Sequence, residues 1–90
     1  MDRNEIEKKV NDVLERKLGG NAEKIEPTAD LLVDLGLDSL DCVEIIMELE
    51  KEFGISISDE KTDKCYTVGD IYTIVEELVW LLFIHLLITT

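Results

Sequence analysis

Hydrophobic residues near the start of the chain recur every three or four positions, with charged residues between them. Over residues 3–18 this repeat brings Ile6, Val10 and Leu14 to one face, which is the pattern of an amphipathic helix. The glycine at position 19 then supplies the left-handed conformation that commonly ends a helix. The pattern predicts a first helix over residues 3–18.

The following stretch, residues 22–36, has no long periodic run. Pro27 cannot continue a helix because it has no backbone N–H, so we expect a long ordered loop. Thr28 is the expected cap of a short turn within this loop. The turn is expected to bury three leucines: Leu31, Leu32 and Leu35.

A second amphipathic pattern covers residues 39–53. Asp38 precedes it as a helix cap, and Gly54 follows as a helix end. The expected buried stripe consists of Cys42, Ile45, Ile46, Leu49 and Phe53. A parallel acidic stripe consists of Asp41, Glu44, Glu48 and Glu52. The pattern predicts a second helix with one apolar and one acidic face.

The last third of the chain predicts two more helices. Residues 55–57 alternate apolar and serine positions, but a strand would need a partner that the chain lacks, so we expect an extended loop. A short helix is expected over residues 59–64, and Thr67 caps a final helix from Val68. Its inward residues are expected to be Val68, Ile71, Tyr72, Val75, Leu78 and Val79. The expected fold class is all-α: a four-helix bundle of three main helices and one short helix, with a long loop between the first and second helices.

The charge of the chain is concentrated in its middle third. The formal net charge is −12, and residues 27–60 hold ten acids against Lys51 alone. Such a field disfavours nucleic acid and anionic membrane surfaces, and favours protein partners with basic patches. A solvated acidic surface needed only for solubility is the alternative explanation.

The potentially reactive side chains form no metal or redox motif. Cys42 and Cys65 are far apart in the sequence, and His85 is the one histidine. We expect both cysteines to be reduced packing residues, as in a cytoplasmic protein. Residues 1–11 are charged throughout and do not resemble a signal peptide.

The segment over residues 35–41, Leu-Gly-Leu-Asp-Ser-Leu-Asp, connects the fold to function. It places Ser39 beside a loop glycine in the first turn of a helix, where a phosphodiester on the hydroxyl is tolerated by the exposed N–H groups and the helix dipole. A nucleophilic serine would need a general base, and His85 lies in a distant apolar tail. The three residues Asp-Ser-Leu alone are equally consistent with an ordinary helix cap.

A longer stretch, residues 30–55 (DLLVDLGLDSLDCVEIIMELEKEFGI), resembles the central segment of acyl carrier proteins of dissociated fatty-acid synthesis. The similarity extends from the first helix to Thr67-Val68-Gly69-Asp70 and covers most of the chain. It implies a non-enzymatic four-helix carrier whose Ser39, flanked by Asp38, receives 4′-phosphopantetheine from coenzyme A through a phosphopantetheinyl transferase. The thiol of this arm, rather than a cysteine, would carry the acyl chain. Cys42 departs from relatives, which often have threonine or another small residue there.

The resemblance also implies two surfaces. The helix after Ser39 would dock basic patches of fatty-acid synthesis enzymes, using Asp38, Leu40, Asp41, Glu44, Met47, Glu48 and Glu50. Acyl carrier proteins shelter the acyl chain between their helices, and the candidate residues for such a cavity are Ile45, Ile46, Leu49, Ile57, Val68 and Tyr72. Core packing alone would explain each of these six apolar residues equally well.

Several other functions remain open. A polyketide, peptidyl or D-alanyl carrier would use the same serine. An acidic interaction or calcium-binding module is a different class, but Asp34, Asp38 and Asp41 lack the alternate spacing and central glycine of a calcium loop. An enzyme is less favoured, because the chain has no general base, metal ligands or nucleotide loop in a suitable arrangement.

The C-terminal run does not fit the resemblance, because carriers of this type end soon after their last helix. Ten of the eleven residues over 78–88 are apolar. A bilayer span needs about 20 such residues, and Glu76 and Glu77 precede the run, so we expect no membrane span. We divide the chain into a carrier domain over residues 1–79 and a tail over residues 80–90 that extends the last helix. The tail is expected to pair with another copy or with another protein, to fold back over the bundle, or to be non-native in origin.

Overall fold

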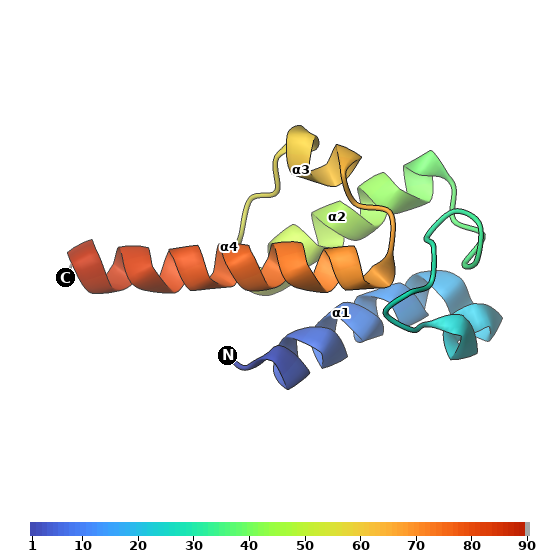
Figure 1. Ribbon diagram of the computed structural model, residues 1–90, viewed down its shortest axis with the longest axis horizontal. Coiled ribbons are helices and arrows are strands. Elements are labelled where there is room, and N and C mark those ends of the chain that lie inside the picture. Colours follow the sequence, from blue (N-terminus) through green and yellow to red (C-terminus); the bar gives the residue numbers. More distant parts are fainter. Residues whose placement is uncertain (90) are drawn as a thin grey trace.

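The computed structural model describes residues 1–89 and is all-α, with four α-helices and a long loop between the first two (Figure 1). The elements in chain order are α1 (Arg3–Leu18), the 3-10 helix η1 (Gly19–Lys24), α2 (Ser39–Phe53), α3 (Asp59–Asp63) and α4 (Val68–Thr89). The predicted fold class is confirmed. The short η1 was not predicted, because its six residues carry no periodic pattern.

Side-chain caps fix the beginnings of the long helices at the predicted places. At α1, Asp2 Oδ1 accepts from the Glu5 N–H at 2.9 Å. At α4, Thr67 Oγ1 accepts from the Asp70 N–H at 3.1 Å. Each bond satisfies one of the N–H groups that the first turn of a helix leaves unpaired.

The core lies where α1 packs against both α2 and α4. The fully buried side chains include Ile6, Val10 and Leu14 of α1, together with Leu49 of α2. The remaining core residues are Val13, Ala29, Leu31, Leu35, Leu37, Ile45, Ile57, Val68, Ile71, Tyr72 and Val75. The loop before α2 therefore contributes to the core as the helices do.

This loop is held by backbone bonds to the start of α4. Val68 N–H donates to Ala29 at 3.1 Å, and Gly69 N–H donates to Pro27 at 2.9 Å. A Cβ at position 69 would lie 3.0 Å from the Pro27 carbonyl oxygen, a tight contact that would make the Pro27 backbone shift by a few tenths of an ångström. The one β-bridge among the described residues joins Asp30 and Thr67, and Ile55 to Ile57 form an extended loop as predicted.

The turn inside the loop differs from its prediction in two respects. Its cap is Asp30, whose Oδ1 accepts from the N–H groups of Leu32 at 2.9 Å and Val33 at 2.8 Å, whereas Thr28 was expected. The prediction that Leu32 is buried is wrong, because its side chain is 53% exposed. In a tight turn successive side chains diverge, so Leu31 and Leu35 face the core while Leu32 and Val33 face outward.

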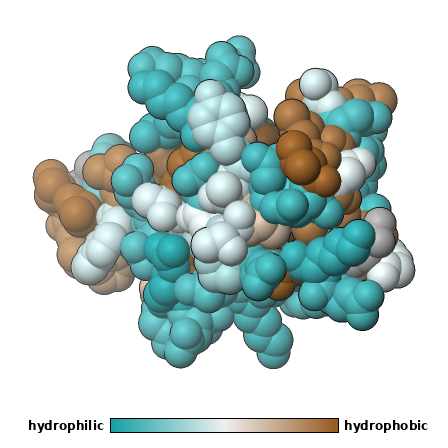
Figure 2. All heavy atoms as spheres, turned by 45° about the vertical axis from the view of Figure 1, so that its right-hand side comes forward, coloured by the Kyte–Doolittle hydropathy of each residue, from teal (hydrophilic) through white to brown (hydrophobic). Residues whose placement is uncertain are grey.

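The helix α4 continues without a break from the core into the C-terminal run and projects beyond the bundle (Figure 1). Figure 2 shows a largely hydrophilic surface with hydrophobic atoms gathered in two places, on the left, where α4 projects, and at the upper right. Because the run is continuous with the earlier turns, a stretch over Val68–Ile88 is long and apolar enough to cross a membrane. That finding rests on length and composition only, and the first turns of α4 are buried in the core, so the expectation that the chain has no membrane span stays a prediction. The division at residue 79 stays a prediction.

Candidate functional site

Ser39 is the first residue of α2 and its side chain is exposed. The two neighbouring acids form a reciprocal capping box around it. Asp41 N–H donates to Asp38 Oδ1 at 2.8 Å, and Asp38 N–H donates to Asp41 Oδ2 at 3.1 Å. These two bonds fix the first turn, so that the Ser39 hydroxyl leaves the protein from a rigid position.

The backbone that precedes Ser39 is also held in a fixed conformation. Gly36 has φ 69°, a left-handed value that residues with a Cβ rarely adopt. Leu37 then turns into the core, and its N–H donates to the Leu31 carbonyl at 3.0 Å. The chain is thus anchored two residues before the exposed serine.

A groove of about 320 Å³ opens beside Ser39, between α2 and the α3–α4 region. Its lining residues are Asp30, Leu31, Leu32, Ser39, Cys42, Val43, Thr62, Asp63, Cys65 and Tyr66. A much smaller cavity of about 20 Å³ lies deeper, lined by Leu31, Cys42, Ile45, Ile46, Thr62, Cys65 and Ile71. The four residues common to both are Leu31, Cys42, Thr62 and Cys65. They form the boundary between groove and cavity.

Only two of the six residues predicted to line an acyl cavity border this space, namely Ile45 and Ile46. The other four, Leu49, Ile57, Val68 and Tyr72, are buried in the core. Tyr72 faces α1, where its hydroxyl donates to Asn11 Oδ1. Prediction missed Cys42, Thr62 and Ile71, which lie in three different helices. It also missed Leu31 of the loop and Cys65 of the α3–α4 connection, where no helical periodicity reveals which side a residue faces. The acyl-chain role of all six stays a prediction.

Both cysteine thiols in this region are free and half-buried. Burial raises the pKa of Cys65 to about 12. Burial also raises the pKa of Cys42, and the charges of Asp41 and Asp38 raise it further. A thiol with a raised pKa holds little thiolate at neutral pH and is a weak nucleophile. The geometry agrees with their expected role as packing residues.

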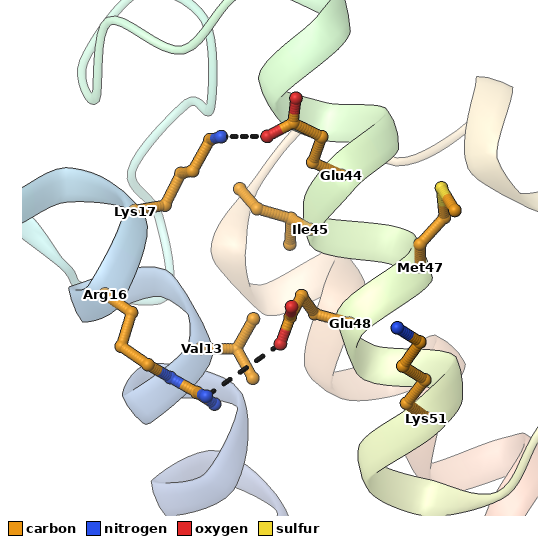
Figure 3. A pocket seen from close by; sticks show the side chains of 8 residues that line it. All are labelled: Val13, Arg16, Lys17, Glu44, Ile45, Met47, Glu48 and Lys51. Carbon is orange, nitrogen blue, oxygen red and sulfur yellow. Dashed lines mark hydrogen bonds and ion pairs between the residues drawn. The ribbon is translucent and has the colours of Figure 1, made fainter.

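The acidic face of α2 is partly paired with α1, as Figure 3 shows. Lys17 contacts Glu44, and its Nζ lies 3.5 Å from Asp41 Oδ1. Arg16 reaches Glu48 at 3.8 Å. The hydrogen bond to Glu44 is the main reason that the pKa of Lys17 is raised, so the ammonium stays charged. An incoming basic partner would therefore compete with α1 for these acids.

The remaining residues predicted to dock partners fall into two groups. Leu40 and Met47 are 65% and 54% exposed, and Val43 between them, which prediction missed, is 51% exposed. Their spacing of three and four places them on one side of α2, and this spacing could have revealed Val43. Glu50 is different, because its Oε2 accepts from the Ile57 N–H at 2.8 Å and holds the loop after α2.

These observations define a small helical scaffold that presents one serine on a rigid helix start, beside an apolar groove and an acidic face. A comparison with protein families agrees with this description: the model of the phosphopantetheine attachment site family matches residues 8–75. The chain belongs to this family. It is therefore a non-catalytic carrier domain, with 4′-phosphopantetheine as its covalent cofactor. Such domains are modified by phosphopantetheinyl transferases and interact with the enzymes of a pathway.

The residues around Ser39 fit a phosphodiester-linked arm. The capping box occupies the N–H groups of Asp38 and Asp41, whereas those of Ser39 and Leu40 donate to no acceptor within residues 1–89. Unpaired N–H groups at a helix start can receive phosphate oxygens. The cofactor, when bound, supplies a terminal thiol that forms thioesters.

Proposed function

We propose that Ser39 carries the phosphopantetheine arm and that the protein holds acyl intermediates of dissociated fatty-acid synthesis. The observation that carries the assignment is the exposed Ser39 hydroxyl in a first turn where two N–H groups have no acceptor within residues 1–89. The other two serines are less suitable as attachment sites. Ser58 Oγ already accepts from the Lys61 N–H at 3.2 Å, and Ser56 lies in the extended loop.

The face of α2 beyond Ser39 supports reversible docking. Its exposed Leu40 and Met47 lie among Asp41, Glu44 and Glu48. Individual exposed ion pairs contribute only about 0.2–1 kcal/mol, so several of them give fast exchange of partners rather than a permanent complex. A carrier that must leave one enzyme for the next needs this property.

The assignment of Ser39 is tested by intact-protein mass spectrometry. The apo protein is incubated with coenzyme A and a broad-specificity phosphopantetheinyl transferase. We expect a gain of about 340 Da, the mass of the arm added to a hydroxyl. Ser39→Ala should abolish the gain because it removes the acceptor oxygen.

Ser56→Ala is the matched control, since it removes a second exposed hydroxyl and leaves α2 intact. It should gain the same mass as the parent protein. A folded Ser39→Ala variant that still gains the arm would overturn the assignment. An unmodified parent with an intact helical spectrum would also overturn it, and would favour a protein-interaction module without a prosthetic group.

The pathway is tested by loading the modified carrier. A malonyl transferase of dissociated fatty-acid synthesis should load it. With an acyl primer, the matching synthase, ketoreductase, dehydratase and enoyl reductase should then convert the product to a saturated chain. Polyketide enzymes that extend the chain without full reduction would identify a polyketide carrier instead. Loading by an amino-acid-activating enzyme, with no malonyl loading, would identify a peptidyl or D-alanyl carrier.

We also propose that the protein works in the cytoplasm. The two free thiols support a reducing compartment, because half-buried cysteines that pack against apolar neighbours are typical of proteins that form no disulfides. Thiol titration of the protein isolated under non-reducing conditions tests this location. Two reactive thiols after unfolding are expected, and a disulfide would contradict the proposal.

A further inference from the structure

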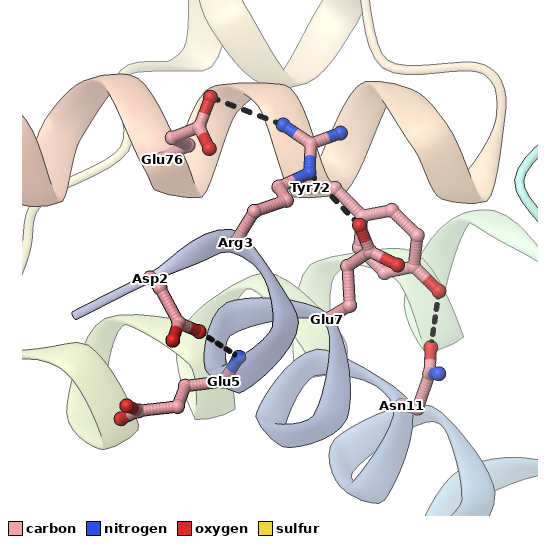
Figure 4. A network of polar contacts seen from close by, with 7 residues as sticks. All are labelled: Asp2, Arg3, Glu5, Glu7, Asn11, Tyr72 and Glu76. Atoms are coloured by element: carbon pink, nitrogen blue, oxygen red, sulfur yellow. Dashed lines mark hydrogen bonds and ion pairs between the residues drawn. The ribbon is translucent and has the colours of Figure 1, made fainter.

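The helix α4 changes character abruptly where it leaves the bundle. Glu76 Oε1 pairs with Arg3 of α1 at 3.2 Å (Figure 4), and Glu77 Oε2 pairs with Lys61 at 3.7 Å. Residues 78–88 contain no charge, and His85 is their one polar side chain. Two ion pairs therefore mark a boundary, with charged surface on one side of it and apolar helix on the other.

Beyond this boundary Leu78 and Val79 still pack against the core, and the residues that follow them are exposed. Every residue from Trp80 to Ile88 is exposed, including Trp80 at 58%, Leu81 at 59% and Leu87 at 63%. Successive residues turn by about 100°, so a run of this length presents apolar side chains all around the axis. The start of α1 borders Trp80 and Phe83. The segment nevertheless stays exposed along its length, and we name it the apolar extension (residues 80–88).

The distribution of apolar side chains around the axis of α4 decides what can cover the apolar extension. A second copy would cover one stripe of each helix and leave the others in water. A helix that lies flat on a membrane needs a polar face, which this segment lacks. A helix that is apolar all round requires surroundings that are apolar all round, such as the hydrocarbon of a bilayer.

The length of the uncharged segment limits how deeply it can enter a bilayer. Residues 78–88 rise about 16 Å at 1.5 Å per residue, and a bilayer core is about 30 Å thick. The first turns of α4 could not complete a span, because Val68, Ile71 and Val75 are buried in the bundle. The segment therefore reaches into one leaflet only.

We propose that the apolar extension inserts end-on into one leaflet of a lipid bilayer and tethers the carrier there. Trp80 then lies near the interface between hydrocarbon and headgroups, which tryptophan favours. The first turn of α2, which holds Ser39, lies at the other end of the molecule from the projecting end of α4 (Figure 1), so it is far from the bilayer. The net charge of −12 favours uncharged lipid over anionic lipid.

The test uses the full chain carrying Ser39→Ala, so that no attached acyl chain can contribute to binding. A negative result therefore counts against the membrane proposal alone and not against the assignment of Ser39 as the attachment site of the arm. The protein is mixed with phosphatidylcholine vesicles, and the vesicles are recovered by flotation. Trp80, the one tryptophan, reports insertion through a blue shift of its emission and through quenching by brominated acyl chains. We expect flotation with the vesicles, and weaker flotation with vesicles rich in phosphatidylglycerol at low salt.

Two lysine variants distinguish insertion from other binding. Ile84→Lys places a charge inside the apolar extension, and we expect the partition coefficient to fall at least about tenfold. Thr73→Lys adds the same charge at an exposed position of α4 within the bundle and should leave partition nearly unchanged. Equal flotation of the parent and Ile84→Lys would overturn the proposal. So would a chain that stays in solution, whether monomeric or associated with further copies by light scattering.

Discussion

α2 and α4 separate their polar and apolar residues in different directions. In α2 the separation runs around the helix, so Ile45 and Leu49 are buried while Glu44 and Glu48 are exposed along the same few turns. In α4 the separation runs along the axis, with a buried first half and an exposed apolar end. Periodicity around a helix therefore reports packing within the bundle. A change along the axis reports where the bundle ends.

The largest expected effect contrasts one leucine from each helix. Leu49→Ala in α2 removes a fully buried side chain and should lower the free energy of unfolding by about 2–5 kcal/mol. Leu81→Ala in the apolar extension should change it by less than about 0.5 kcal/mol, because Leu81 is 59% exposed. Urea unfolding followed by circular dichroism measures both. A similar loss in the two variants would mean that the extension is packed in solution, as expected for self-association.

An intermediate effect concerns the carboxylates at the two helix starts. Burial alone would raise the pKa of Asp70, but the N–H groups of Tyr66 and Thr67, at 2.9 and 3.0 Å, bring it below its usual 3.8. The Asp38 N–H is the main cause that lowers the pKa of Asp41, followed by Lys17. A depressed folded-state pKa contributes stability that is complete above pH 3.8 and declines as pH falls toward the folded-state value.

We therefore expect Asp70→Asn and Asp41→Asn each to weaken the loss of stability on acidification. The unfolding midpoint in urea, measured between pH 6 and pH 2.5, gives the slope for each protein. Asn retains an acceptor oxygen, so part of each cap should survive at neutral pH. A slope that matches the parent protein in both variants would contradict this account of the two caps.

The smallest expected effect concerns the pairing of α1 with the acidic face of α2. Lys17→Gln removes the cation beside Glu44 and Asp41 and should raise the association rate with a basic partner about two- to threefold at low salt. Lys8→Gln makes the same change of net charge at an exposed position of α1 and should have a smaller effect. Stopped-flow binding to the phosphopantetheinyl transferase at two salt concentrations distinguishes the local effect of Lys17 from the effect of net charge. Equal rates in the two variants would show that net charge alone steers the partner.

The sequence allowed prediction of those parts of the fold that depend on near neighbours. Asp38 and Thr67 cap helices through residues three positions away, and Gly54 has the left-handed conformation that ends α2. The repeat of apolar residues likewise identified the buried face of α1. On α2 it identified the buried Ile45 and Leu49, whereas the other predicted members of that stripe are only half-buried. All of these signals lie within one or two helical turns of the residue concerned.

The features that escaped prediction depend on distant parts of the chain. Leu31 reaches the groove beside Ser39 because its N–H donates to Tyr66 at 2.9 Å, across a large sequence separation. Glu50 carries the sequence pattern of a surface acid, but its carboxylate is directed to the backbone of Ile57. Periodicity within one helix contains no information about which loop will lie against it.

The fixed position of Ser39 affects how an acyl group on an arm at this residue would meet an enzyme. Because Ser39 belongs to the same helix as the proposed docking surface, a partner that bound α2 would also fix the point from which an arm at Ser39 starts. All positional freedom of the thioester then comes from the arm itself. Its effective concentration at a bound active site depends on arm length and on the distance from Ser39, as for any tethered ligand. Moving the docking position by one helical turn, about 5.4 Å, would therefore shift the whole volume that the cargo can search.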